Sequence, residues 1–108
     1  MPVYLVAEIK VTDDSWIPNY AAHVHDIVHK HGGKYLARTR NIKTIEGPES
    51  DTTVMALLEF PSTEAVLAFE DDPAYAEHRA ARRAGSVSRF RIIDATDVAG
   101  AIPYLPKG

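Results

Sequence analysis

The sequence predicts a mixed α+β domain in which one antiparallel sheet carries its helices on a single face. Strand-like and helix-like segments alternate along the 108 residues, and the amphipathic helices of so short a chain suffice to cover only one face. Residues 53–60, Thr-Val-Met-Ala-Leu-Leu-Glu-Phe, have the length of a strand but are apolar on both faces, because side chains alternate across a strand. The second apolar face needs another cover, most economically a second copy of the chain. We therefore expect a homodimer with an interior cavity.

The first half of the chain predicts a strand followed by a helix. Residues 3–11 alternate in the period of a strand, and Asp13, Asp14 and Ser15 offer N-caps for a helix that runs to about His31. Glycines 32 and 33 supply the positive φ with which helices commonly end. One apolar stripe recurs at helical spacing and comprises Ile17, Tyr20, Ala21, Val24, Ile27, Val28 and His31.

The second half predicts two strands, a broken helical region and a last strand. We expect a short strand over 34–38, which 40–45 continue or turn beside, then a loop over 46–51 and an antiparallel return over 53–60. Ser62 caps a second helix, and Asp72 with Pro73 begins a further helix that ends at Gly85. Residues 87–93 form the last strand. The order β-α-β-β-α-β is the ferredoxin-like arrangement. It assigns residues 1–95 to a single domain and 96–108 to a C-terminal extension.

Composition excludes several classes of function. The formal net charge of −3 and the absence of a basic run argue against nucleic acid as a partner. Cysteine is absent, which excludes disulfides, thiol nucleophiles and thiolate metal sites. The N-terminus lacks the basic region of a signal peptide, and no apolar run is long enough to span a bilayer, so no membrane partner is expected. We expect a cytoplasmic protein.

Four blocks of sequence carry a family resemblance: VYLVAEIKVTD, HGGKYLARTRNIKTIEG, LLEFPSTEAVLAFEDDPAY and SRFRIID. Together they resemble the DUF 1330 family of uncharacterised proteins over about residues 3–95. The resemblance implies a dimeric α+β barrel, in which two ferredoxin-like protomers pack sheet against sheet. It implies no activity, since related barrels include heme-degrading and cofactor-free monooxygenases, lactone isomerases and plain ligand binders. The extension beyond the last strand departs from the family pattern.

The candidate ligand-binding residues are polar or aromatic groups at positions where family members tend to keep such groups. They are Arg38, Tyr75, Arg82 and Ser88. Arg38 lies one strand period from Leu36, so we expect both on one face, with the guanidinium near a buried surface. Buried there, it needs a carboxylate, either Glu59 or Glu8 in a structural ion pair or the acid group of a ligand. The structural pair is the favoured interpretation.

The helix after Pro73 brings an aromatic ring and several cations onto one face. Tyr75, His78, Arg79 and Arg82 follow one another at helical spacing, and Arg83 is adjacent. They either line the mouth of a pocket or form a solvated face whose cations favour the helix C-terminus. For Arg79 and Arg83 the solvated face is the preferred interpretation; for Tyr75 and Arg82 the two stand even.

Histidines crowd the first helix, and His25 and His29 have the i, i+4 spacing that can hold one metal ion. A dedicated site needs a third ligand, for which His78, Asp26 and the carboxylates at the helix end are the candidates. A polar helix flank with one core histidine, His31, is the favoured interpretation, so no metal site is assigned. No phosphate loop or dinucleotide fingerprint is present, and no cofactor is expected.

Three functions remain open at this point. The first is a module that binds a small, partly apolar, anionic metabolite between sheet and helices. The second is a cofactor-free isomerase or monooxygenase in which the candidate catalytic residues Tyr20 or His31 transfer a proton beside Arg38. The third is a structural dimer without a ligand.

Overall fold

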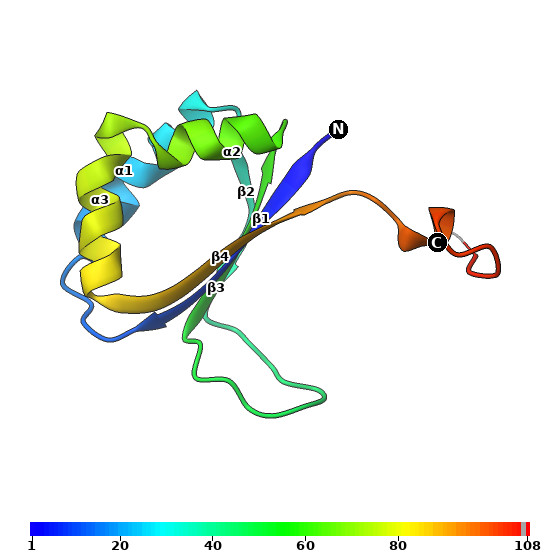
Figure 1. Cartoon of the computed structure of the whole chain (residues 1–108). Helices are drawn as coiled ribbons and strands as arrows, with labels where there is room; N and C mark the ends of the chain where they lie inside the picture. Colours follow the sequence, from blue (N-terminus) through cyan, green and yellow to red (C-terminus); the bar gives the residue numbers. More distant parts are fainter. Residues whose placement is uncertain (107) are drawn as a thin grey trace.

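A four-stranded antiparallel sheet forms one layer of the molecule, and three α-helices cover one of its faces (Figure 1). The computed structural model describes residues 1–106 and residue 108. The elements in chain order are β1 (Val3–Val11), α1 (Ile17–Lys30), β2 (Lys34–Thr39), β3 (Val54–Phe60), α2 (Thr63–Glu70), α3 (Pro73–Ala84), β4 (Ser86–Asp94) and the short 3₁₀ helix η1 (Val98–Gly100). This is the ferredoxin-like α+β fold, as the sequence predicted.

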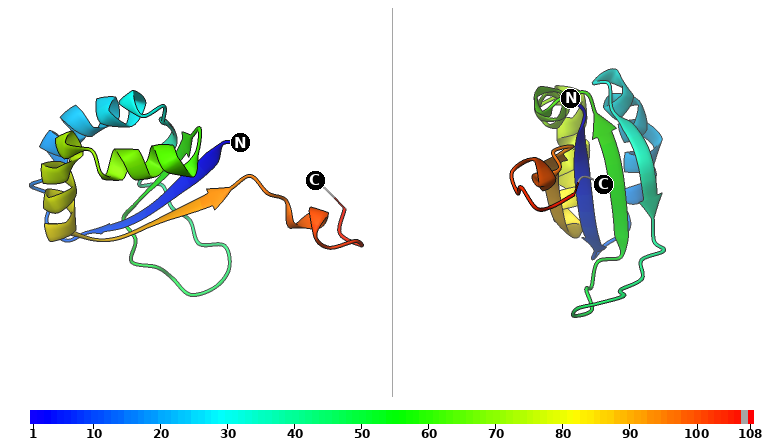
Figure 2. Two further views of the ribbon diagram at one scale, coloured as in Figure 1. Left: turned by 45° about the horizontal axis from the view of Figure 1, so that its top comes forward. Right: turned by 90° about the vertical axis from the view of Figure 1, so that its right-hand side faces the viewer.

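The strands lie in the order β2-β3-β1-β4, so β1 and β3 are central and β2 and β4 are the edges (Figure 2). Leu5 pairs with Leu58 of β3 on one side and with Ile92 of β4 on the other. The predicted continuation of β2 through residues 40–45 does not form. The chain instead leaves the sheet after Thr39 and returns at Val54 through a long loop.

The helix boundaries follow the sequence signals except at the start of α1. Ser62 and Asp72 cap α2 and α3 by accepting hydrogen bonds from the backbone N–H groups of Ala65 and Ala74. Gly32 follows α1 with a φ of +80°, which glycine adopts without strain. The N-cap of α1 is Trp16, which makes no side-chain cap. The expectation that residues 13–15 cap α1 is therefore wrong. The indole of Trp16 instead donates a hydrogen bond to the carbonyl oxygen of Gly85.

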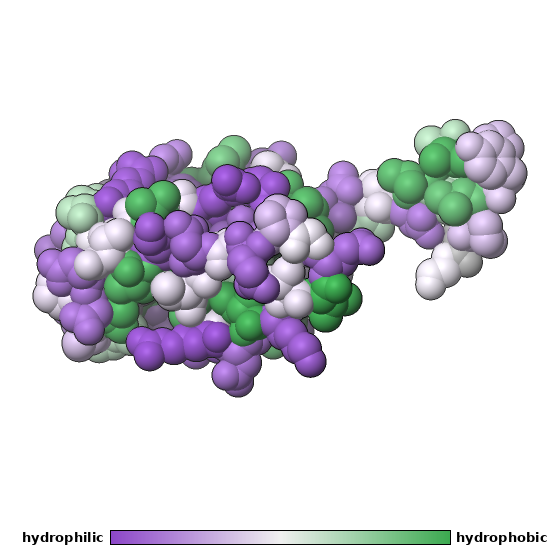
Figure 3. Space-filling model, turned by 90° about the horizontal axis from the view of Figure 1, so that it is seen from below, coloured by the Kyte–Doolittle hydropathy of each residue, from purple (hydrophilic) through white to green (hydrophobic). Residues whose placement is uncertain are grey.

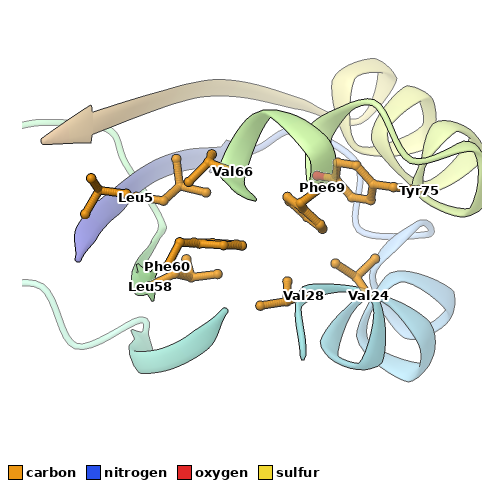
Figure 4. Close-up of a cluster of buried hydrophobic side chains, with 9 residues drawn as sticks. Leu5, Val24, Val28, Leu58, Phe60, Val66, Phe69 and Tyr75 are labelled. Atoms are coloured by element: carbon orange, nitrogen blue, oxygen red, sulfur yellow. The ribbon is translucent and has the colours of Figure 1, made fainter. Parts of the chain in front are cut away.

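The core lies between the helix-facing side of the sheet and all three helices (Figure 4). Tyr75 is fully buried, and its ring stacks on that of Phe69 with the centroids 4.3 Å apart. Figure 4 shows Val24 and Val28 of α1 facing this aromatic pair. The buried cluster comprises Val3, Leu5, Val24, Val28, Leu58, Phe60, Val66, Phe69 and Tyr75.

No helix covers the other face of the sheet within the residues that the structure describes (Figures 1 and 2). Met55 and Leu57 of β3 lie half-buried on this face, and Val6 of β1 pairs with Leu57. Ion pairs flank them. Glu8 accepts a hydrogen bond from Arg91 at 3.3 Å, and Lys34 lies 3.4 Å from Glu59. The outer face thus has an apolar centre with charged surroundings.

The C-terminal segment projects from the end of β4 away from the body (Figure 1). In the space-filling view from below it stands off as a separate, partly hydrophobic lobe, while hydrophobic patches on the body alternate with hydrophilic ones (Figure 3). Where the sequence showed no periodicity, the structure has one turn of 3₁₀ helix, capped by Asp97. None of the helices in the described part of the chain has the length and hydrophobicity that crossing a membrane requires.

Gly85 joins three elements at the end of α3. Its carbonyl oxygen accepts hydrogen bonds from the backbone N–H groups of Thr12 and Asp13, at 2.9 and 3.0 Å, and from the indole Nε1 of Trp16 at 3.2 Å. The end of β1, the start of α1 and the end of α3 are therefore held by one acceptor. The glycine is needed here because a Cβ atom would collide with the Trp16 ring.

Asp72 ties α1 to the start of α3. Its carboxylate accepts hydrogen bonds from His31 Nε2 at 2.7 Å, from Lys30 Nζ at 2.9 Å and from the N–H of Ala74 at 2.9 Å. These contacts, with that from His31 the strongest, hold the pKa of Asp72 well below its usual range, whereas desolvation acts in the opposite direction. His31 therefore contributes to a junction between helices.

We expect the Asp72→Ala variant to melt about 5 °C lower than the wild type at pH 7, since it loses a cap and two charge-assisted contacts. The pKa of Asp72 is lower in the folded protein than in the unfolded chain, where it is about 3.9. Its carboxylate therefore contributes its full stabilisation above about pH 3.9, and this contribution is lost as the pH falls through the folded-state pKa. Thermal melts from pH 7 to 2.5 measure the difference in melting temperature between the wild type and Asp72→Ala. The control is Asp71→Ala, a change at an exposed neighbour. A difference that stays constant over this range contradicts the prediction.

Candidate functional site

An apolar cavity, here the sheet–α1 cavity, lies between the helix-facing side of the sheet and helix α1. Its volume is about 590 Å³, which lies within the usual range for small-molecule sites. The walls are mostly aliphatic and aromatic. They comprise Leu5, Ala7, Ile9, Val11, Ile17, Ala21, Val54, Ala56, Leu58, Phe69 and Phe90. The polar lining residues are Asp14, Trp16, Tyr20, His25, Tyr35, Arg38, Thr39, Arg40 and Thr53.

A β-bulge in β2 directs Arg38 to this cavity. Tyr35 pairs with Leu58 and Ala37 with Leu57, so Leu36 is an extra residue opposite a single step of β3. Arg38 then pairs with Ala56, which shares the helix-facing side with Leu58. Strict alternation would have placed Tyr35 and Arg38 on opposite faces. The expectation that Leu36 and Arg38 share a face is therefore wrong. Arg38 reaches the helix-facing side of the sheet but is exposed, so the expectation that it is buried is also wrong.

Arg38 makes its contacts with aromatic rings. Its Nη2 donates a hydrogen bond to Nδ1 of His25 at 3.0 Å, and its Cζ lies 4.0 Å from the centroid of the Tyr35 ring. The predicted pair with Glu59 or Glu8 is wrong, since Glu59 contacts Lys34 and Glu8 contacts Arg89 and Arg91 on the outer face. Arg38 has no carboxylate within ion-pair distance in the described part of the chain. The guanidinium at the cavity is thus available to an anion.

Tyr20 places a hydroxyl group on the cavity wall. Its oxygen lies 2.8 Å from that of Tyr75, and burial together with this neighbour raises the pKa of Tyr20 far above its usual value. The group therefore stays protonated at physiological pH. When Tyr75 donates within the pair, the hydrogen of Tyr20 is free to point at a ligand. The site offers a hydrogen-bond donor here rather than a base.

The structure separates the other predicted site residues from this cavity. Arg82 and Ser88 line a second cavity between α2, α3 and β4. Tyr75 reaches the sheet–α1 cavity only through its hydroxyl contact with Tyr20, and His31 lies at the Asp72 junction. Of the predicted residues, Tyr20 and Arg38 alone line the sheet–α1 cavity. The predicted catalytic role of His31 stays a prediction.

The histidine rings of α1 contact different neighbours. The rings of His25 and His29 lie 4.4 Å apart, and His25 also stacks on Tyr35. His23 instead stacks on His78 of α3. No group of three or more histidine, aspartate or glutamate side chains within residues 1–106 and 108 is placed to hold a metal ion.

A family comparison agrees with this architecture. The sequence model of a family described as a domain of unknown function, DUF1330, matches residues 2–96. The chain belongs to the DUF1330 family. The match covers the whole sheet and all three α-helices. No curated protein matches this DUF1330 chain at a significant level.

Solved structures similar to the DUF1330 chain share its fold at low sequence identity. The RPA0582 protein of unknown function from Rhodopseudomonas palustris superposes with a TM-score of 0.76 at 18% identity, covering 89% of this chain and 83% of that one. SnoaB, a cofactor-independent oxygenase from Streptomyces nogalater, gives 0.64 at 16% identity over 89% and 94% of the two chains. An antibiotic biosynthesis monooxygenase gives 0.58 at 12% identity over 90% and 100%. At such identities the likeness shows the fold alone.

Sequence reasoning missed several residues of the DUF1330 cavity. Trp16 lines the cavity, and so does His25, which was expected on a polar helix flank. Tyr35 was not singled out, although it holds the guanidinium of Arg38. One signal was present in the sequence: an aromatic residue three positions before an arginine at an expected strand. It becomes informative only once the bulge is known.

Proposed function

We propose that this protein binds a small, partly apolar anion in the sheet–α1 cavity. The observation that carries the proposal is a guanidinium, free of any described carboxylate partner, at the rim of a cavity with apolar walls. An apolar ligand body gains from leaving water at these walls, and an acidic group gains a charge-assisted contact with Arg38. The protonated hydroxyl of Tyr20 supplies a further donor.

The proposal includes a homodimer that forms through the outer face of the sheet. Met55 and Leu57 are only half-buried there, and such an apolar centre gains from burial against its copy. Its flanking charges are of both signs, which permits pairing across a two-fold axis. The sheet–α1 cavity lies on the opposite side of the sheet, so each protomer keeps its own cavity.

We expect the Arg38→Ala variant to bind the fluorescent anion 1-anilinonaphthalene-8-sulfonate about tenfold more weakly than the wild type, because it loses a charge-assisted contact. This probe combines an aromatic body with a sulfonate. The neutral analogue N-phenyl-1-naphthylamine lacks the sulfonate and is expected to bind both proteins equally. Fluorescence titration measures both affinities, and energy transfer from Trp16, the single tryptophan, reports the cavity.

Arg89→Ala is the matched control, since this arginine lies on the outer face near Glu8. We expect it to leave both affinities unchanged. If Arg38→Ala and Arg89→Ala lower the affinity for the sulfonate probe equally, the proposal is contradicted, because the probe is then attracted nonspecifically to positive charge. If neither substitution changes the affinity for the sulfonate probe, the probe binds an apolar surface, as expected of a structural dimer without a ligand site.

Proton-transfer chemistry is a second candidate, favoured by one observation. The Tyr20 hydroxyl lies on the cavity wall within hydrogen-bond distance of Tyr75, so it is placed to donate a hydrogen bond to negative charge that develops on a bound ligand, although its raised pKa opposes complete transfer of the proton. Such an enzyme requires no cofactor. It is distinguished from a binding module by Tyr20→Phe, which removes turnover in an enzyme while the affinity for the anion persists.

A further inference from the structure

A second cavity of about 530 Å³, here the Arg82 cavity, lies between helices α2 and α3 and the edge strand β4. It shares Leu5 and Phe90 with the sheet–α1 cavity, so a wall of side chains is common to both. Its other lining residues are Val66, Leu67, Glu70, Arg82, Arg83, Ser86, Ser88 and Ile92.

Arg82 is a buried cation that has no counter-charge among the residues that the structure describes. Only 3% of its surface is exposed, and none of the ion pairs between described residues involves its guanidinium. The Nε atom is fully buried and makes no hydrogen bond among the described residues. The Cζ atom lies 4.1 Å from the centroid of the Phe90 ring, which offers a cation–π contact but no hydrogen-bond acceptor. A buried guanidinium left in this state is costly, and an incoming anion relieves the cost.

The acidic residue of the cavity does not neutralise Arg82. Glu70 lies 3.8 Å from Nη1 of Arg79, which also donates a hydrogen bond to the Glu70 carbonyl oxygen. Arg83 adds a second positive charge to the lining. With Glu70 paired to a residue outside the lining, the cavity keeps a net positive charge.

The hydroxyl groups of Ser86 and Ser88 already donate their hydrogens in hydrogen bonds within the protein. Ser86 Oγ donates its one hydrogen to the carbonyl oxygen of Arg82. In the contact between Ser86 and Ser88, with the oxygens 2.6 Å apart, Ser88 must therefore donate. Ser88 can turn that hydrogen toward an anion only by giving up this bond. Arg82 is thus the principal donor of the cavity.

We propose that the Arg82 cavity binds a small carboxylate that carries a short aliphatic chain. The guanidinium fork matches a carboxylate, and Val66, Leu67 and Ile92 offer an apolar surface to the chain. This site is separate from the sheet–α1 cavity and does not depend on Arg38. It uses a cation that the proposed function leaves unexplained.

Titration of the full-length protein with butyrate tests this site, followed by ¹⁵N correlation spectra that include the arginine Nε–H signals. We expect saturable shifts of the Arg82 Nε–H and of the Ser86 and Ser88 amides, with a dissociation constant of about 1 mM. Butyramide has the same shape without the charge and is expected to give no shifts at these signals. Saturation by inorganic phosphate but not by butyrate overturns the carboxylate assignment.

Arg82→Met separates a ligand site from a packing role. Methionine retains much of the apolar bulk and removes the unpaired charge, so the variant is expected to melt no lower than the wild type while butyrate shifts at Ser86 and Ser88 disappear. Arg89→Met is the control, with butyrate binding unchanged. Butyrate shifts that persist in Arg82→Met overturn the proposal. Loss of thermal stability in this variant, without butyrate binding to the wild type, likewise overturns it and assigns Arg82 to packing.

Discussion

The Gly85→Ala variant is expected to lose about 3 kcal/mol of its free energy of unfolding. A Cβ atom at this position would overlap the Trp16 ring and lie 2.8 Å from the backbone oxygen of Asp13. Because the contact with Asp13 is with its backbone, the backbone must shift, and the Trp16 ring must move as well. Its movement breaks the hydrogen bond to the Gly85 carbonyl and disturbs the edge-on contact of Trp16 with Tyr20.

Thermal melts followed by circular dichroism and by the emission of Trp16 measure this effect. Trp16 is the only tryptophan, so its emission reports this junction directly. Gly100→Ala is the matched control, because a Cβ there meets no atom within 4 Å and the backbone φ is not positive. Equal melting temperatures for the two variants would contradict the role assigned to Gly85.

The Leu57→Lys variant is expected to shift the protein from dimer to monomer, with a dissociation constant raised by a factor of about 100 or more. Leu57 lies at the apolar centre of the outer face, opposite Val6. In a symmetric interface each copy would then bury an unpaired ammonium group near the two-fold axis. Native mass spectrometry over a range of concentrations measures the equilibrium.

Leu67→Lys is the control for the dimer, since it makes the same chemical change at a half-exposed position on α2. We expect it to leave association unchanged. A wild-type protein that is monomeric at all concentrations contradicts the proposed interface. So does a Leu57→Lys variant that associates as the wild type does, because the apolar centre then contributes nothing.

The fold was predictable because its signals are local. Ser62 and Asp72 cap their helices as expected, and Gly32 and Gly85 follow α1 and α3. Hydrophobic patterning placed the strand ends to within one residue, apart from the expected continuation of β2 over 40–45, since it depends only on which faces of each strand are buried. The start of α1 was not predictable, because the position of Trp16 depends on a carbonyl that lies 69 residues away.

The sequence predicted the types of residue that line the cavities, but it did not predict which of them line the same cavity. Arg38 and Arg82 were expected to contact one ligand, yet they line different cavities. The bulge at Leu36 breaks the two-residue period from which the face of Arg38 was inferred. The partners of Arg38 come from α1 and from the same strand, and no property of the sequence around Arg38 distinguishes His25 from Glu59 as its neighbour. Grouping of this kind depends on tertiary packing.

Several polar groups of the two cavities lie on the edge strands of the sheet. Arg38 belongs to the edge strand β2, and Ser86 and Ser88 belong to the opposite edge strand β4, whereas β1 and β3 supply mainly aliphatic walls. An edge strand pairs on one side only, so a substitution there disturbs fewer neighbours than one in the centre. Ligand preference could therefore diverge among homologues through changes at the two edges while the central strands keep their composition. The arrangement divides the sheet into a mainly aliphatic centre and two edges that carry polar side chains into the cavities.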